Sequence, residues 1–139
     1  MSFLLDTNVI SETTKPRPDA NVVHWLASTA RERVFLSIVS LAEMRQGIER
    51  LESGRRKTLM DTWLRENVAA QFGQRLLLAD ADTADQWGRV IARARALGRP
   101  LEPMDAWIAA TALQHRLTLV TRNTRDFEAT GIALLDPWQ

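Results

Sequence analysis

Residues 1–10 read MSFLLDTNVI and place a carboxylate directly after a short apolar run. The run Phe3–Leu5 is too short and too apolar for a surface strand, so we predict a central strand of a parallel sheet, buried on both faces. Open parallel sheets bind their ligands beyond the carboxyl ends of their strands. Asp6 follows the strand directly and is therefore expected at the rim of a binding crevice.

Composition limits the class of protein. The 139 residues suffice for one domain with a substantial core, and we expect that domain to span residues 1–139. The absence of cysteine excludes a disulfide scaffold and a thiolate metal site. No apolar run approaches the roughly 20 residues that cross a bilayer, and the amino terminus lacks the pattern of a signal peptide. We therefore expect a cytoplasmic protein without a membrane partner.

The net charge of the chain does not identify its binding partner. The formal net charge of +1 is too small to indicate a nucleic-acid-binding surface by itself. All but two of the 18 basic residues are arginine, whose planar guanidinium group binds phosphate or carboxylate through two parallel hydrogen bonds. A compositional bias toward arginine and alanine explains this count equally well.

Short apolar segments alternate with helical patterns along the chain. We predict strands at residues 3–5, 34–38, 75–79, 117–121 and 132–135. We predict helices at residues 19–29, 40–52, 58–70, 82–98 and 104–115, the second of them started by a capping box between Ser40 and Glu43. This alternation favours an α/β sandwich with a mostly parallel sheet.

Four carboxylates occupy comparable positions in this arrangement, namely Asp6, Glu43, Asp105 and Asp126. Each has a structural alternative, because a carboxylate also caps helices, complements their positive ends or closes turns. The start of the helix that carries Asp105 can lie at either edge of the sheet. Considered together, the four favour a metal site, because crowded carboxylates repel one another unless a cation neutralises them. Mg²⁺ and Mn²⁺ prefer such oxygen ligands, and two ions about 3.5–4 Å apart can hold a phosphoryl displacement in line.

At these residues the sequence resembles the PIN-domain ribonucleases, and within them the FitB-like toxins of VapBC-type toxin–antitoxin pairs. The matching segments run in family order along nearly the whole chain: LDTNVISE (5–12), SIVSLAE (37–43), DAWIAATA (105–112), TRNTRDF (121–127) and DPW (136–138). Their ordered combination is much more specific than any one of them. The resemblance implies a three-layer α/β/α domain around a central, mostly parallel sheet of about five strands.

The resemblance also implies an activity and its partners. The expected activity is a toxic endoribonuclease that depends on Mg²⁺, or alternatively Mn²⁺, and cuts single-stranded RNA regions. The expected partners are a cognate antitoxin, the RNA substrate and a second copy of the chain. Higher assemblies would form with the antitoxin, and promoter DNA would be bound only through it.

The family's acidic residues map onto Asp6, Glu43 and Asp105, which are the expected catalytic residues and metal ligands. Asn123 and Asp126 compete for the fourth position; we assign the acidic role to Asp126 and an accessory polar role to Asn123.

Further polar groups lie at strand ends and suit hydrogen bonds that orient ligating carboxylates, namely Thr7, Asn8 and Thr121. Arg89, Arg93 and Arg99 lie near one face of a predicted helix and are candidates for leading a substrate toward the site.

Two other functions are compatible with the sequence. A non-catalytic PIN-like module would bind a partner through the same scaffold. An aspartyl phosphatase of the haloacid dehalogenase type also places a nucleophilic Asp after its first strand, with a second Asp two residues later. Here that second position is Asn8, and neither Lys15 nor Lys57 is suitably placed to supply the lysine that such enzymes use.

Overall fold

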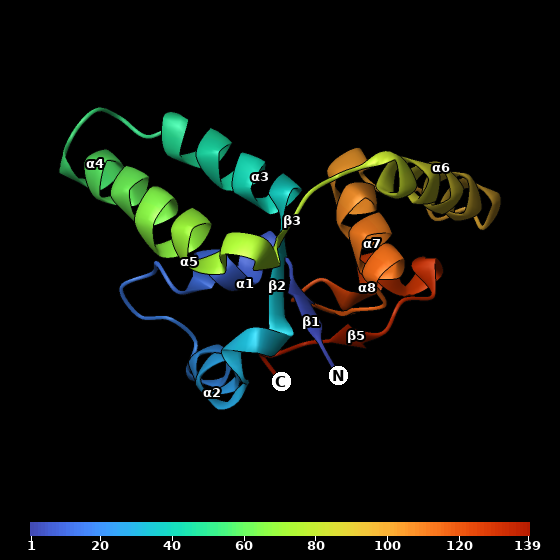
Figure 1. Ribbon diagram of the computed structural model, residues 1–139, viewed down its shortest axis with the longest axis horizontal. Helices are drawn as coiled ribbons and strands as arrows, with labels where there is room; N and C mark the ends of the chain where they lie inside the picture. The colour runs from blue at the N-terminus through green and yellow to red at the C-terminus, as the bar shows by residue number, and fades with distance from the viewer.

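The structure of the protein is a computed structural model that describes residues 1–139. A sheet of five parallel strands runs through its middle (Figure 1). Its strands lie in the order β3-β2-β1-β4-β5. Their bounds are β1 Phe3–Leu5, β2 Val34–Ser37, β3 Leu76–Leu77, β4 Thr118–Val120 and β5 Leu134–Leu135. The first strand is therefore central, as predicted, with Leu5 opposite Leu36 of β2 on one side and Val120 of β4 on the other.

Helices cover both faces of the sheet. Figure 1 shows α1, α3, α4 and α5 on one side and α6, α7 and α8 on the other. Their bounds are α1 Thr7–Glu12, α2 Ala20–Ser28, α3 Ile38–Glu49, α4 Arg55–Thr62, α5 Ala70–Phe72, α6 Ala81–Ala96, α7 Pro103–His115 and α8 Thr124–Phe127. A π-helical segment, Trp63–Ala69, joins α4 to α5, and short 3-10 turns lie at Arg31–Arg33, Gly73–Arg75 and Glu128–Thr130. None of these helices has the length and apolar composition to cross a membrane.

Two hydrophobic cores separate the layers, because successive side chains of a strand point to opposite faces. Leu5 packs with Val9 of α1 and Leu64 of the π-helical segment in one core. Leu4 packs with Ile108 of α7 in the other core. Both leucines of β1 are essentially unexposed, which confirms the prediction of a strand buried on both faces and of a three-layer arrangement.

The predicted capping box between Ser40 and Glu43 is wrong. Helix α3 begins at Ile38, and its cap is Ser37, whose hydroxyl accepts a hydrogen bond from the backbone N–H of Val39 at 3.0 Å. Ser37 ends β2 with an extended backbone, so the chain passes from strand to helix without a loop. This earlier start leaves the side chain of Glu43 available for contacts away from its own helix.

Several other boundaries differ from the predictions. The third strand contains only Leu76 and Leu77, and the long helix α6 is capped by Asp80, which forms a capping box with Thr83. The helix predicted for residues 58–70 begins at Arg55 and continues to Phe72 through the π-helical segment. These differences leave the order and direction of the elements unchanged.

Candidate metal centre

Asp6 is held at the end of β1 by two hydrogen bonds to its carboxylate. Its Oδ1 atom accepts from the backbone N–H of Thr7 at 2.7 Å, and its Oδ2 atom accepts from the hydroxyl of Thr121 at 2.7 Å. Thr121 follows β4 and is fully buried, and its hydroxyl accepts in turn from the backbone N–H of Asn123. The Asp6 side chain therefore has little freedom to rotate away from the carboxyl edge of the sheet.

Glu43 is tied to the same edge through Thr7. The Thr7 hydroxyl donates to Oε1 of Glu43 at 2.7 Å and lies 2.9 Å from the hydroxyl of Ser40. These contacts join the first turn of α1 to α3, and they explain why Ser40 is fully buried. The sequence pattern assigned Ser40 to a helix cap, whereas the structure gives it a place beside the candidate site.

Asp105 lies in the first turn of α7, and Asp126 lies in the short helix α8. Only two residues separate α7 from β4, so α7 must run toward the amino edge of the sheet and begin at the carboxyl edge. The open question of where Asp105 lies is settled by this path. Asp105 and Asp126 line one pocket of about 340 Å³ at that edge.

The four carboxylates lack ion-pair partners. None of them forms an ion pair with lysine, arginine or histidine. Burial raises the pKa of Asp6, and the charges of Glu43 and Asp126 raise it further, against the hydrogen bonds that the carboxylate accepts. Burial, followed by the charges of Asp6, Glu43 and Asp126, raises the pKa of Asp105 to about 6. Asp6 and Asp105 thus lie within the electrostatic influence of neighbouring carboxylates.

The donor set fits a hard divalent cation, because all of its charged groups are carboxylate oxygens. A cation would also offset the repulsion that raises the pKa values of Asp6 and Asp105. No three acidic or histidine side chains approach closely enough in this structure to hold one ion together. Binding an ion therefore requires water ligands or side-chain rotation, and Mg²⁺ commonly retains several waters in protein sites.

The predicted accessory residues differ in what they contact. Thr7 and Thr121 each donate a hydrogen bond to one carboxylate, and their support of a metal ligand stays a prediction. The Oδ1 atom of Asn8 is buried without a hydrogen-bond partner. Asn123 contacts Thr121 through its backbone, while its side chain makes no hydrogen bond. Roles for the Asn8 and Asn123 side chains stay predictions.

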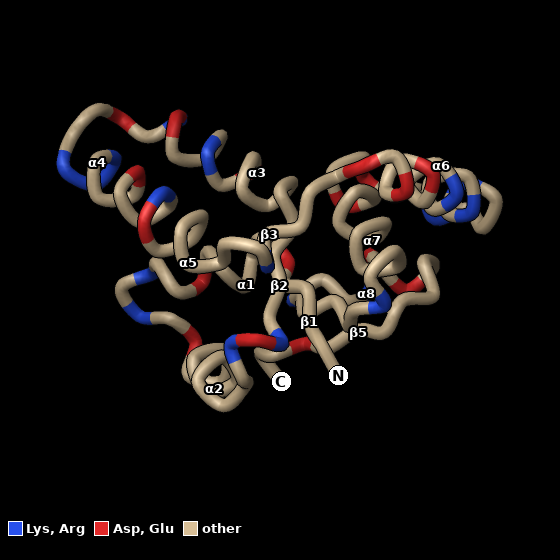
Figure 2. Tube along the Cα trace, viewed as in Figure 1, with Lys and Arg blue, Asp and Glu red and all other residues tan.

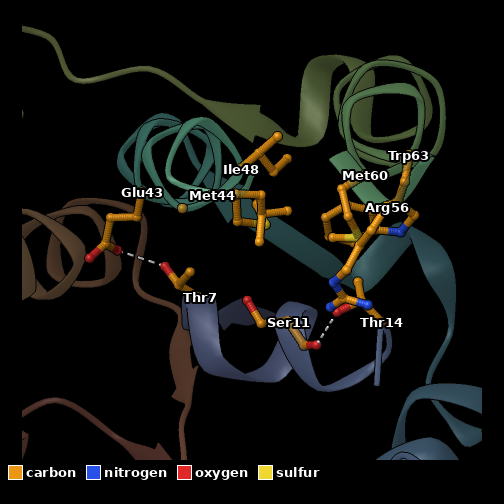
Figure 3. Close-up of a pocket in the computed structure, with 11 residues that line it drawn as sticks. Thr7, Ser11, Thr14, Glu43, Met44, Ile48, Arg56, Met60 and Trp63 are labelled. Atoms are coloured by element: carbon orange, nitrogen blue, oxygen red, sulfur yellow. Dashed lines mark hydrogen bonds between the residues drawn. The ribbon is translucent and has the colours of Figure 1, made fainter. Parts of the chain in front are cut away.

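A second pocket, of about 210 Å³, opens on the other side of Glu43, between α1, α3 and α4. Figure 3 shows Thr7 and Glu43 at one end of this pocket, and Arg56 extending from α4 toward Thr14, two residues after α1, at the other. Met44, Ile48 and other apolar side chains line the space between these ends. The candidate site is therefore flanked by a partly apolar groove on this side.

Comparison with known proteins agrees with the fold. A family model of the PIN domain matches residues 3–133. The chain belongs to the PIN-domain family. This PIN domain is 39% identical over 136 residues to Toxin FitB of Neisseria gonorrhoeae, and the match covers 98% of each chain. It is 35% identical over 137 residues to VapC ribonuclease Y4jK of Sinorhizobium fredii, covering 99% of this chain and 98% of that protein.

A solved structure extends the likeness to three dimensions. The structure of FitAB bound to an IR36 DNA fragment matches this PIN domain with a TM-score of 0.94 and 38% identity, covering 99% of this chain and 96% of the other. The resemblance read from the motifs and the predicted three-layer fold are both confirmed by these matches.

The burial of Asp105 and the negative charges near it make the stability of the metal-free protein depend on pH. Its pKa of about 6 exceeds the ordinary 3.8, so the folded state binds more protons than the unfolded state between these values and loses stability as the pH rises through them. We expect Asp105→Asn, with a chelator present, to raise the melting temperature by about 2–4 °C at about pH 8 and to leave it nearly unchanged at about pH 4. Differential scanning calorimetry at the two pH values measures both effects.

Asp85→Asn is the matched control, because Asp85 is exposed and paired only with Arg89 on its own helix. Its melting temperature should stay within about 1 °C of the wild-type value at both pH values. A loss of stability in Asp105→Asn at about pH 8 would contradict the repulsion that we infer.

Proposed function

We propose that this PIN domain is the toxin of a toxin–antitoxin pair and acts as a divalent-metal-dependent endoribonuclease on single-stranded RNA. One observation carries the proposal: four carboxylates from separate segments of the chain lie toward the carboxyl edge of the sheet, and none of them forms an ion pair. PIN-domain ribonucleases in general depend on divalent metal ions, and the similar proteins include a VapC ribonuclease. RNA as substrate and an antitoxin as partner place the proposed activity in the cytoplasm.

The proposed metal ligands are Asp6 and Asp105, with Glu43 binding directly or through water and Asp126 holding a second ion or orienting a water. A bound divalent cation would supply neutralisation of the carboxylates and activation of water for attack on phosphorus. We propose Mg²⁺ as the physiological ion and Mn²⁺ as an ion that can replace it, because both accept an all-oxygen donor set.

The chain's own residues supply the geometry of this site. Thr121 and the backbone N–H of Thr7 fix both oxygens of Asp6, and the Thr7 hydroxyl fixes one oxygen of Glu43. Such partners hold ligating carboxylates in place and are worth about 10–100-fold in metal affinity or activity. Water that attacks phosphorus adds its oxygen to the phosphate while the bond to the 3′ oxygen breaks. The expected products therefore carry a 5′-phosphate and a 3′-hydroxyl.

The aspartyl phosphatase alternative finds no support in the structure. Its chemistry needs a lysine beside the nucleophilic aspartate, but Lys15 forms an ion pair with Glu12 and Lys57 forms one with Glu49. Both lysines therefore point to partners outside the acidic site.

The first prediction of this proposal concerns metal dependence. The wild-type protein should cleave a fluorescently labelled single-stranded RNA with Mg²⁺ or Mn²⁺ and lose this activity in EDTA. Asp6→Asn should reduce the cleavage rate by at least about 100-fold, because it removes a ligand rather than a supporting hydrogen bond. Gel analysis of the products, with enzymatic tests for the 5′-phosphate, measures rate and chemistry together.

Asp85→Asn again serves as the control and should cleave like the wild type, since this carboxylate lies exposed on α6. Cleavage that survives EDTA, or that is unchanged in Asp6→Asn, would contradict the metal site. A wild-type protein that binds RNA without cutting it would instead favour the non-catalytic module.

A second prediction decides the fourth acidic position. Asp126 raises the pKa of both Asp6 and Asp105, whereas Asn123 contacts the site only through its backbone. We expect Asp126→Asn to slow cleavage by about 10–100-fold and to raise the Mg²⁺ concentration that gives half-maximal rate. Asn123→Ala should change both quantities by less than about threefold. Titration of the initial rate against Mg²⁺ gives the comparison, and a larger loss in Asn123→Ala would reverse our assignment.

We also propose a small antitoxin as the partner of this PIN domain. The similar proteins include Toxin FitB and a FitAB assembly on a DNA fragment. A carboxy-terminal segment of the antitoxin that inserts an arginine among the four carboxylates would neutralise them in competition with the metal. The partly apolar groove beside Thr7 and Glu43 offers contact area next to that position. Promoter DNA would be bound by the antitoxin, and the PIN domain would self-associate into dimers and larger complexes.

The partner can be tested by co-expression with the antitoxin from the native operon. The two chains should purify together in a fixed ratio, and the complex should cleave RNA much more slowly than the PIN domain alone. Because arginine and metal compete for the same oxygens, raising Mg²⁺ should restore part of the activity. Size-exclusion chromatography and the RNA cleavage assay measure these effects. Recovery of the PIN domain alone would contradict the partnership, and inhibition that Mg²⁺ leaves unchanged would contradict the competition.

A further inference from the structure

The pocket that contains Asp105 and Asp126 also contains two guanidinium groups. Arg99, in the loop after α6, and Arg125, in α8, lie among its lining residues, together with the carboxylate of Glu102. Only one of the seven lining residues is hydrophobic. The pocket is therefore a polar extension of the acidic site in which cationic side chains lie beside the carboxylates.

The two arginines differ in what holds them. Arg99 donates from Nη2 to the backbone carbonyl of Arg125 at 2.7 Å, and its Nη1 atom lies 3.4 Å from Oε2 of Glu128. Arg99 thereby fixes the backbone of α8 at the position that carries Arg125. The guanidinium of Arg125 itself has no hydrogen bond and no ion pair, although Asp126 is its neighbour in sequence. Its donors are available to a ligand.

We propose that Arg125, positioned by Arg99, binds the RNA phosphate adjacent to the phosphodiester bond that is cut. This inference rests on the proposed function. An RNA strand that presents one phosphate to the four carboxylates brings the neighbouring phosphates into the same negative field. A guanidinium group beside the acids offsets that repulsion, and its planar donors fit two oxygens of one phosphate.

The arginines of α6 are less suited to binding this phosphate. Figure 2 shows basic residues along the carboxyl-terminal half of α6. Arg89 is paired with Asp85 on the same helix, and the guanidinium of Arg93 lies beside Gly131. Of the three arginines predicted to lead substrate toward the site, only Arg99, in the loop after α6, lines this pocket. Arg125 is a residue that the sequence patterns did not single out.

Binding of uncut RNA gives the most direct test. Asp6→Asn serves as the background because it keeps the RNA intact, and Arg125→Gln and Arg33→Gln are each added to it. Arg33 is a matched control, because it is exposed and lies just before β2, at the opposite edge of the sheet. We expect Arg125→Gln to weaken binding of a labelled single-stranded RNA by about 5–10-fold and to reduce the slope of log K against log salt by about 0.7, the value for one phosphate contact. Fluorescence anisotropy at several salt concentrations measures both quantities.

The cleavage kinetics give an independent readout in the otherwise wild-type protein. A contact made equally in the bound and transition states changes KM rather than kcat. Arg125→Gln should therefore raise KM by about 5–10-fold with kcat within about twofold, and Arg125→Lys should recover part of the loss because it restores the charge. Arg33→Gln should leave both constants unchanged.

Three results would overturn the assignment. The first is that Arg125→Gln binds RNA with the same affinity and salt slope as Arg33→Gln. The second is that it lowers kcat and leaves KM unchanged. The third is that it weakens antitoxin binding and leaves RNA binding unchanged. Failure of the proposed function is a separate result, namely absence of cleavage by the wild type, because the binding comparison in the Asp6→Asn background needs no catalysis.

Discussion

The hydrogen bond from Thr121 to Asp6 is the contact on which the site depends. It joins residues 115 positions apart, and it exists because the parallel pairing of Leu5 with Val120 places the next residue of each strand side by side. The backbone N–H of Asp6 also donates to the carbonyl of Val120, so the pairing continues to the carboxylate itself. A shift of one residue in this register would turn Asp6 to the other face of the sheet. The register of two short strands thus fixes the position of the first acid.

The buried position of Asp6 lowers the stability of the folded protein. A carboxylate at the end of a buried strand loses hydration, and three more carboxylates add like-charge repulsion, so the pKa values of Asp6 and Asp105 rise. The structure limits this cost by giving both oxygens of Asp6 hydrogen-bond donors. It leaves the four charges without a basic partner, so the repulsion remains as a driving force for binding a cation. Stability and the proposed activity therefore place opposite demands on Asp105.

Local patterns predicted the centre of this site better than its surroundings. The apolar run Phe3–Leu5 indicates a buried central strand, and the residue after such a strand must lie at the carboxyl edge, so the place of Asp6 followed directly. Glu43 is tied to the same edge through Thr7, although its helix starts at Ile38 and not at the apparent capping box. Serine at 37 and serine at 40 are equally good caps in sequence, and only the tertiary contact of Ser40 with Thr7 distinguishes them. The edge for Asp105 follows from the two-residue connection between α7 and β4, which makes α7 begin at the carboxyl edge of the sheet.

The pockets beside the acids are lined by long side chains from separate elements. The periodicity of apolar residues in the sequence does not predict where such side chains lie. Arg125 precedes Asp126 in the chain and reads as part of a solvated turn, yet the backbone contact from Arg99 brings it into the pocket of Asp105 and Asp126. On the opposite side, Thr7 and Glu43 end the groove that leads to Arg56. Asp105 and Asp126 therefore line a polar pocket, whereas Glu43 lines a separate, partly apolar groove. A partner held in the groove can reach the acids without filling the polar pocket, so inhibition by a protein and binding of an RNA phosphate can be governed by different residues of one site.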